Sequence, residues 1–130
     1  MENQKKLILI VEDEQPLSKA LGIKLALEGF RINSAANGKA GLEIALREKP
    51  DLILLDIAMP VMDGISMLQE LRKDSWGSNA NVIVLTNLGS DTTKIAAAME
   101  KDVTEYFIKS DISLEQIADK IKDKLHTTKS

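Results

Sequence analysis

Five polar residues of this sequence each stand at the downstream end of a short apolar run. One run ends in two neighbouring carboxylates, a second in an aspartate, a third in a threonine and a fourth in a lysine; these residues are Glu12, Asp13, Asp56, Thr86 and Lys109. If the runs are parallel strands of an open sheet, their downstream ends share one edge, where such folds bind ligands. Distance along the chain is therefore no obstacle to a single charged site.

The three carboxylates of such a site would repel each other until a cation or a proton entered. Magnesium suits them, because it is a hard ion that takes oxygen ligands, keeps several waters and typically uses one or two carboxylates together with a phosphate oxygen. Asp56 would then accept a phosphoryl group, since an aspartate carboxylate is a known nucleophile at phosphorus. Lys109 would supply an ammonium group and Thr86 a hydroxyl donor for the transferring oxygens.

Each of these residues, taken alone, also has a purely structural interpretation. Glu12 and Asp13 can be N-terminal helix carboxylates before Pro16, Asp56 can form a turn, and Thr86 can be an ordinary β-branched strand residue. The charged site is favoured because all of these residues follow apolar runs in the same way.

Strand-like and helix-like segments alternate along the chain. Unbroken apolar runs are typical of strands buried on both faces of a parallel sheet, and residues 31–35 form a weaker strand near an edge. The strands are expected at 7–11, 31–35, 52–55, 82–85 and 106–108, and the helices at 16–28, 41–48, 67–71, 91–100 and 114–125, the last with a capping box from Ser113 and Gln116. Five strands alternating with five helices predict an α/β fold, a doubly wound parallel sheet with helices on both faces.

Length, composition and charge exclude several classes of protein. The 130 residues are the length of one domain, and 44% hydrophobic with 28% charged residues is ordinary for a soluble globular protein. A net charge of -3 argues against direct nucleic-acid binding, which usually requires a basic stripe. No cysteine is present, which fits a reducing compartment, and no apolar run is long enough for membrane insertion. We therefore expect a cytoplasmic protein.

Four segments carry a resemblance to a known family. They are VEDE at 11–14, LLDIAMPVMDG at 54–64, VLT at 84–86 and YFIK at 106–109. In this order and at these separations the segments resemble the receiver domains of two-component response regulators. The resemblance implies strand order 2-1-3-4-5, with a receiver domain over residues 1–126 and a flexible tail at 127–130.

The resemblance also implies a role for each site residue. Asp56 would accept a phosphoryl group from a phosphohistidine in a reaction that depends on Mg²⁺, or on Mn²⁺ in its place. Asp13 and Asp56 would bind the metal directly, Glu12 through water, and Ala58 through its backbone carbonyl. Thr86 and Lys109 would contact the phosphoryl oxygens. Tyr106 and Thr86 would form the switch pair, the ring moving inward behind the hydroxyl.

The resemblance implies two kinds of partner, a phosphoryl donor and an output partner. The donor would be a sensor histidine kinase or a phosphotransfer protein. The output partner or output domain is unknown, and it would respond to a change in the face made by the fourth helix, the fifth strand and the fifth helix. A phosphorylation-dependent dimer is an open alternative. Such a protein is no enzyme in the usual sense, because it catalyses only its own phosphorylation and dephosphorylation.

One departure from the family pattern bears on these expectations. Proline usually follows the lysine, through a cis bond, whereas Ser110 follows Lys109 here. A cis bond to a residue other than proline costs about 3–4 kcal/mol, so we expect a trans bond and a less tightly held Lys109. An aspartyl-phosphate phosphatase is a second function, but such enzymes need an acid/base aspartate where this chain has Ala58. A receiver-like scaffold with little phosphorylation is a third.

Overall fold

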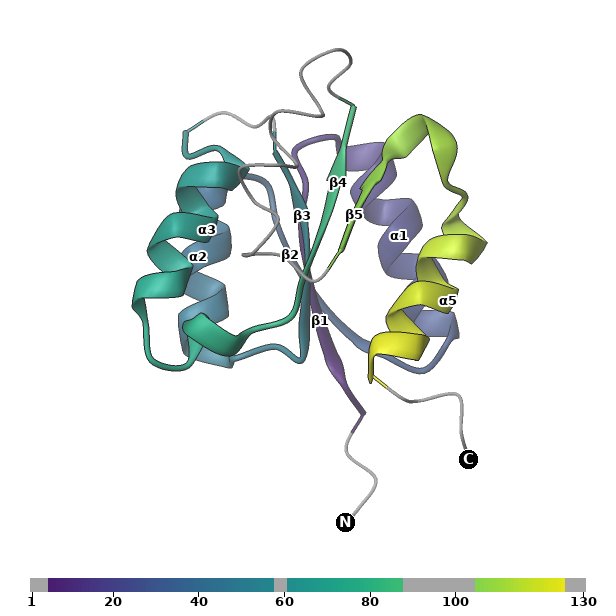
Figure 1. Ribbon diagram of the computed structural model, residues 1–130. Coiled ribbons are helices and arrows are strands. Elements are labelled where there is room, and N and C mark those ends of the chain that lie inside the picture. The colour runs from purple at the N-terminus through teal and green to yellow at the C-terminus, as the bar shows by residue number, and fades with distance from the viewer. Residues whose placement is uncertain (1–4, 58–60, 88–104, 126–130) are drawn as a thin grey trace.

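The computed structural model describes residues 5–57, 61–87 and 105–125. From β1 to β4 strands and helices alternate, as the apolar runs predict, and the segment between β4 and β5 lies outside the described residues. Two short 3-10 helices (η1 and η2) are also present (Figure 1). In chain order the elements are β1 (Leu7–Val11), α1 (Gln15–Leu27), β2 (Arg31–Ala35), α2 (Gly38–Glu48), β3 (Leu52–Asp56), α3 (Gly64–Lys73), η1 (Gly77–Asn79), β4 (Val82–Thr86), β5 (Glu105–Ile108), η2 (Lys109–Asp111) and α5 (Leu114–Leu125).

The five strands form one sheet in the order β2-β1-β3-β4-β5, and every neighbouring pair is parallel. This is the predicted order 2-1-3-4-5. Strands β1, β3 and β4 are buried along their whole length, whereas β2 at one edge is partly exposed. The prediction is therefore confirmed for the buried strands β1, β3 and β4 and for the weaker edge strand β2. It is wrong for β5, which was expected to be buried on both faces but is only partly buried, because it forms the other edge of the sheet.

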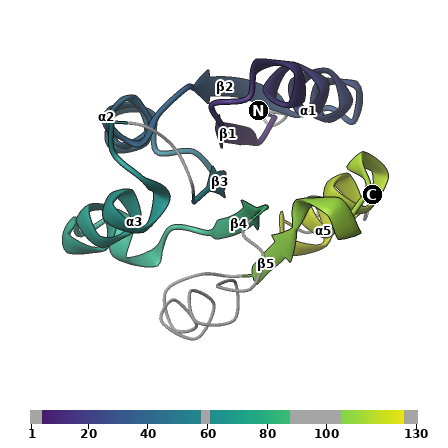
Figure 2. The ribbon, with the colours of Figure 1, turned by 90° about the horizontal axis from the view of Figure 1, so that it is seen from above.

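The helices cover the two faces of the sheet in pairs. Helices α1 and α5 lie on one face, and α2 and α3 lie on the other (Figures 1 and 2). Because successive side chains of a strand point to opposite faces, β1 sends Ile8 and Ile10 into the core under α1 and α5, and Leu9 and Val11 into the core under α2 and α3. The sheet thus separates two hydrophobic cores.

Local sequence signals set the helix ends. Asn37 caps α2 by accepting the N–H of Ala40 at 2.8 Å, and Asp63 caps α3 by accepting the N–H of Ser66 at 2.8 Å. The two helices accordingly begin earlier than the predicted residues 41 and 67. At α5 the predicted capping box is confirmed, since Ser113 Oγ accepts the N–H of Gln116 at 3.0 Å and Gln116 Oε1 accepts the N–H of Ser113 at 2.8 Å.

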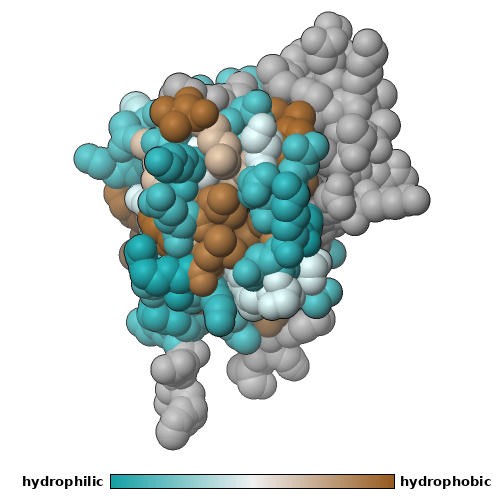
Figure 3. Space-filling view, turned by 90° about the vertical axis from the view of Figure 1, so that its left-hand side faces the viewer, coloured by the Kyte–Doolittle hydropathy of each residue, from teal (hydrophilic) through white to brown (hydrophobic). Residues whose placement is uncertain are grey.

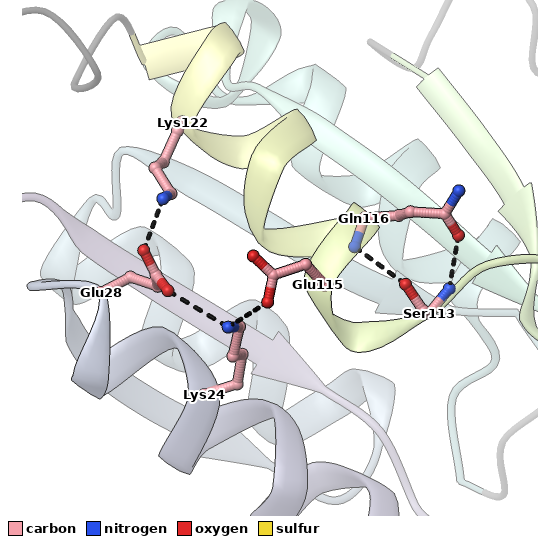
Figure 4. Close-up of polar contacts among 6 residues, drawn as sticks. All are labelled: Lys24, Glu28, Ser113, Glu115, Gln116 and Lys122. Carbon is pink, nitrogen blue, oxygen red and sulfur yellow. Dashed lines mark hydrogen bonds and ion pairs between the residues drawn. The ribbon is translucent and has the colours of Figure 1, made fainter.

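Ion pairs connect α5 to α1 along their exposed sides (Figure 4). Lys24 of α1 contacts Glu115 near the start of α5 and also Glu28 at 3.2 Å, and Glu28 in turn contacts Lys122 of α5. These four side chains alternate in charge, so each one stabilises its neighbours. The two helices are therefore joined by charge at the surface as well as by apolar packing beneath.

The opposite face, made by α2 and α3, combines polar rows with an apolar seam. Hydrophobic atoms remain visible between polar side chains in the space-filling view (Figure 3). The partly buried Leu42 of α2 and Ile65 of α3 pack against the core below, and Leu46 of α2 keeps 37% of its surface exposed. This is the pattern of amphipathic helices that turn one stripe inward.

Some predictions fall outside the residues that the structure describes. The helix expected at 91–100, the backbone carbonyl of Ala58 and the tail at 127–130 are among them. The described part of the chain contains four of the five expected α-helices. None of the helices described is long and apolar enough to cross a membrane.

Candidate functional site

The downstream ends of four strands meet at one edge of the sheet. Val11 at the end of β1 is in register with Leu55, one residue before Asp56 ends β3. Thr86 ends β4 in register with Ile108, the last residue of β5. Glu12 and Asp13 therefore follow β1, and Lys109 follows β5, at the same edge as Asp56 and Thr86. The structure brings together the five residues with which the sequence argument began.

Three carboxylates converge at this edge. One oxygen from each of Glu12, Asp13 and Asp56 lies within 4.8 Å of the other two. Glu12 is 2% exposed and Asp56 is 4% exposed, whereas Asp13 is open to solvent. Burying two carboxylates beside a third is costly without a positive charge close by. The arrangement therefore requires a cation.

Lys109 provides a positive charge inside this group. Its Nζ lies 2.9 Å from Glu12 Oε1 and 3.1 Å from Oε2, 3.6 Å from Asp56 Oδ2 and 3.9 Å from Glu14 Oε1. Burial opposes the charged form most strongly. The hydrogen bond that Lys109 donates to Glu12 and the charges of Asp56, Glu12 and Glu14 together outweigh burial and raise the pKa of Lys109 above its ordinary value. Lys109 is thus a fixed cation of the site.

The geometry after Lys109 corrects one expectation. The described residues contain no cis peptide bond, so the bond to Ser110 is trans, as expected. The looser lysine that we expected with it is not observed, because the side chain is only 10% exposed and is held by Glu12. Tertiary hydrogen bonds to Glu12 position this side chain without the proline that is usual in the family.

Thr86 and Tyr106 lie on neighbouring strands and on the same face of the sheet. Val84 is in register with Tyr106, and Thr86 with Ile108, so the four side chains share one face. Thr86 is 1% exposed, whereas Tyr106 is 41% exposed. The hydroxyl therefore lies at the buried end of β4, and the aromatic ring lies upstream of it at the surface.

Two glycines allow close approach of the loop that follows Asp56. Gly64 donates its N–H to Ile57 O at 2.9 Å, and a Cβ at this position would lie 2.4 Å from Asp56 O. Gly38, the first residue of α2, donates its N–H to Met62 O at 2.9 Å, and a Cβ there would lie 2.1 Å from that oxygen. The sequence shows these glycines, but it does not reveal these backbone contacts.

Glu14 is the site residue that the sequence argument missed. It follows Glu12 and Asp13 directly, so the signal was a third acidic residue in the same run. Its backbone N–H donates to Glu12 Oε2 at 3.1 Å, and its carboxylate faces Lys109. Its side chain is 52% exposed, which places a charge at the mouth of the site.

The donor set fits a hard divalent cation. Every candidate ligand atom of Glu12, Asp13 and Asp56 is a carboxylate oxygen, and the exposed Asp13 leaves one side open to water. Mg²⁺ prefers oxygen ligands and keeps several waters, and Mn²⁺ accepts the same ligand type. These three residues are therefore the ones that would hold such an ion.

Comparison with known proteins gives consistent matches. The profile of the family described as "Response regulator receiver domain" matches residues 8–122. A "Probable transcriptional regulator ycf27" of Porphyra purpurea is 38% identical over 109 residues, which are 84% of this chain and 43% of that protein. The "DNA-binding dual master transcriptional regulator RpaA" of a Synechocystis strain is 36% identical over 88 residues, 68% of this chain and 36% of that protein. The chain therefore spans less than half the length of these curated relatives.

Solved structures match over nearly the whole chain. A "response regulator receiver domain protein (CheY-like)" of Methanospirillum hungatei JF-1 superposes with a TM-score of 0.83 at 27% identity, covering 95% of this chain and 96% of that one. The receiver domain of the sensor histidine kinase PA1611 of Pseudomonas aeruginosa PAO1, solved "with magnesium ion coordinated in the active site cleft", superposes with a TM-score of 0.81 at 25% identity, covering 92% and 97%.

Proposed function

This chain belongs to the response regulator receiver domain family, which works in phosphorylation-switched two-component signalling, and on this basis we propose that Asp56 is its phosphoacceptor. The observation that carries the proposal is the position of Asp56. Its carboxylate is 4% exposed, lies 3.6 Å from the ammonium of Lys109, and shares its edge of the sheet with two further carboxylates. This is a nucleophile beside groups that can neutralise a phosphoryl group.

These positions support the following reaction. A carboxylate oxygen of Asp56 attacks the phosphorus of a phosphohistidine, the new O–P bond forms as the P–N bond breaks, and the imidazole leaves with the bonding electrons and takes up a proton. Mg²⁺, when bound, neutralises charge on the transferring oxygens. Lys109 and Thr86 contribute an ammonium group and a hydroxyl donor to those oxygens. Hydrolysis of the acyl phosphate by water returns Asp56 to its starting state.

We infer that Glu12, Asp13 and Asp56 hold the metal, with Asp13 and Asp56 as direct ligands and Glu12 acting through water. Their convergence within 4.8 Å supports this assignment, and the backbone carbonyl of Ala58 is proposed as a further ligand by family resemblance. The PA1611 receiver domain, described with a coordinated magnesium ion, is a related precedent. Mn²⁺ is expected to substitute for Mg²⁺.

We propose that Thr86 and Tyr106 transmit the state of Asp56. They share one face of neighbouring strands, and the ring of Tyr106, which is 41% exposed, would move inward when the Thr86 hydroxyl turns toward a phosphoryl oxygen. The responding surface would be formed by β5, α5 and the segment 91–100. We expect an output partner or output domain there, with a phosphorylation-dependent dimer as an alternative.

The proposed donor is a sensor histidine kinase or a phosphotransfer protein, and the proposed location is the cytoplasm. The RpaA relative is described as DNA-binding, but the aligned segment is 36% of its length. Since this chain has a net charge of -3, we assign nucleic-acid contact to parts of such proteins outside the aligned segment. We also propose that the chain has no separate substrate and catalyses only its own phosphorylation and dephosphorylation.

Phosphorylation by small phosphodonors tests the proposal. With Mg²⁺ and acetyl phosphate or phosphoramidate, the wild type should gain one phosphoryl group by intact-mass spectrometry, and chelator should prevent the gain. Asp56→Asn should gain none, whereas Asp123→Asn, a matched change at an exposed position of α5, should behave as the wild type. A wild type that gains nothing would favour the scaffold alternative, and turnover of added phosphoesters would favour the phosphatase alternative.

A further inference from the structure

Glu14 occupies a helix-capping position but does not cap the helix. It is the N-cap residue of α1, and its side chain accepts no hydrogen bond from the first turn. A carboxylate at this position usually stabilises the free N–H groups of the helix. Here the carboxylate lies 3.9 Å from Lys109 Nζ. The side chain is therefore directed toward the site and away from the helix terminus.

The backbone of Glu14 is fixed by the site itself. Its N–H donates to Glu12 Oε2 at 3.1 Å, and the same oxygen accepts from Lys109 Nζ at 3.1 Å. Glu12 and Lys109 are 2% and 10% exposed, whereas the Glu14 side chain is 52% exposed. Glu14 thus adds a negative charge at the entrance, above a buried ion pair that positions it.

The charge of the site shows what this extra carboxylate does. Four carboxylates and one ammonium give the site, with Glu14, a formal charge of -3. A divalent cation leaves one negative charge, and without Glu14 it would leave none. An anionic phosphodonor that arrives from solution therefore meets a repulsive entrance because of Glu14. A phosphoryl group carried on a docked protein meets the same repulsion, but docking contacts elsewhere offset it.

We propose, on the basis of the function proposed above, that Glu14 is a specificity-determining residue that disfavours free, small anionic phosphodonors relative to protein-borne phosphohistidine. It acts through its charge, and the same charge strengthens the binding of the divalent cation. Removing it should therefore have two effects of opposite sign, faster loading from small dianions and weaker metal binding. If Glu14 only supported the fold, its removal would slow loading and also weaken metal binding.

The test compares two small donors of different charge on the full chain. Acetyl phosphate is a dianion at neutral pH and phosphoramidate is a monoanion. At saturating Mg²⁺ and low salt, Glu14→Gln should load from acetyl phosphate about threefold to tenfold faster than the wild type. Loading from phosphoramidate should rise by about the square root of that factor, because the Coulomb energy scales with the donor charge. Glu14→Lys should extend both changes in the same direction.

Metal affinity and salt dependence provide independent readouts. Calorimetric titration should give Glu14→Gln a Mg²⁺ affinity about twofold to fivefold lower than that of the wild type. Salt of about 0.5 M should reduce the difference in loading rate, since screening acts over a few ångströms at that concentration. Glu14→Asp, which keeps the negative charge, should retain the wild-type donor preference. Glu48→Gln, an exposed change at the far end of α2, is the control for net charge.

Different outcomes separate this inference from the proposed function. If neither the wild type nor Glu14→Gln gains a phosphoryl group from either donor, the proposed function fails and the inference falls with it. If the wild type is phosphorylated but Glu14→Gln changes both donors equally, or leaves both the rates and the Mg²⁺ affinity unchanged, only the role of Glu14 is refuted. Opposite changes in loading and metal affinity that diminish with salt would support it.

Discussion

Lys109→Met should destabilise the protein strongly in the absence of metal. The substitution keeps most of the aliphatic stem and removes an ammonium that lies within 4 Å of carboxylate oxygens of Glu12, Glu14 and Asp56. Glu12 and Asp56 are 2% and 4% exposed, so their charges would be left together with little access to water. Breaking a buried pair by removing one partner typically costs about 3–5 kcal/mol, because the remaining charge is uncompensated.

The free energy lost should be smaller than this, because the site lies at the edge of the sheet. Asp13 is open to solvent, and a buried carboxylate can take up a proton when its partner is lost. We therefore expect a loss of about 2–4 kcal/mol in the free energy of unfolding at pH 7. An unfolding entropy of about 2.1 cal/mol/K per residue converts this to a melting temperature lower by about 7–15 °C.

Thermal and urea unfolding with chelator, and again with Mg²⁺, would measure the effect. Mg²⁺ should stabilise Lys109→Met more than the wild type, because the dication replaces the missing charge without having to compete with the lysine. Adding Asp13→Ala to Lys109→Met should recover part of the loss in chelator, since it removes one repelling carboxylate. The control is Lys73→Met, which breaks an exposed pair with Glu70 and should cost about 0–1 kcal/mol.

The dependence on pH adds a further check. The pKa of Lys109 is raised above its ordinary value of 10.5, so its contribution is fully present below that pH and is lost only as pH rises through the higher folded-state pKa. The contribution of Lys109 itself should thus stay constant from about pH 7 to pH 9, and the deficit of Lys109→Met should grow over this range only if a carboxylate of the variant holds a proton at pH 7. A variant that melts within about 2 °C of the wild type in chelator, or gains no more than the wild type from Mg²⁺, would refute the reasoning.

Two further predictions concern the frame around the site. Gly38→Ala should lower the free energy of unfolding by about 2–4 kcal/mol, because its Cβ would meet Met62 O at 2.1 Å. Gly22→Ala should instead raise the free energy of unfolding by about 0.5–1 kcal/mol, because the nearest neighbour of its Cβ would be Ile32 Cγ2 at 3.8 Å. Urea midpoints would measure both changes. Glu28→Gln should destabilise the protein at pH 7, and the deficit should shrink with salt and below pH 4.5. Hydrogen bonds from Lys122 and Lys24 lower the pKa of Glu28, so its contribution to stability is present above its ordinary value of 4.5 and is lost as pH falls through the folded-state pKa. A deficit that is unchanged in acid would contradict this.

The strands could be predicted from the sequence almost to the residue. Inner strands of a parallel sheet are buried on both faces, and such burial requires continuous apolar runs like 7–11 and 82–85. Once the runs are in order, the meeting of Asp56, Thr86 and Lys109 at one edge follows from the topology. The grouping of these charged residues could therefore be predicted from the sequence.

What the sequence could not supply depends on contacts between distant segments. Asp63 caps α3, but the cap could not be predicted, because a capping aspartate and a turn aspartate look alike in a sequence. Lys109 is positioned by its hydrogen bond to Glu12, which is 97 residues away in the sequence. The direction of the Glu14 side chain likewise depends on where Lys109 lies, so it could not be predicted from α1 alone.

The pairing of α1 with α5 has a consequence for how the chain assembles as it is synthesised. Among the described residues, the core under α2 and α3 is built from segments between Leu9 and Val84, and these segments are synthesised before α5. The core under α1 is different, because it closes only when Ile117 and Ile121 of α5 arrive. A nascent chain must therefore carry an uncovered apolar face while some ninety residues separate α1 from its partner. The ion pairs of Lys24 with Glu115 and of Lys122 with Glu28 can form only once α5 is present, and they help to hold it against α1.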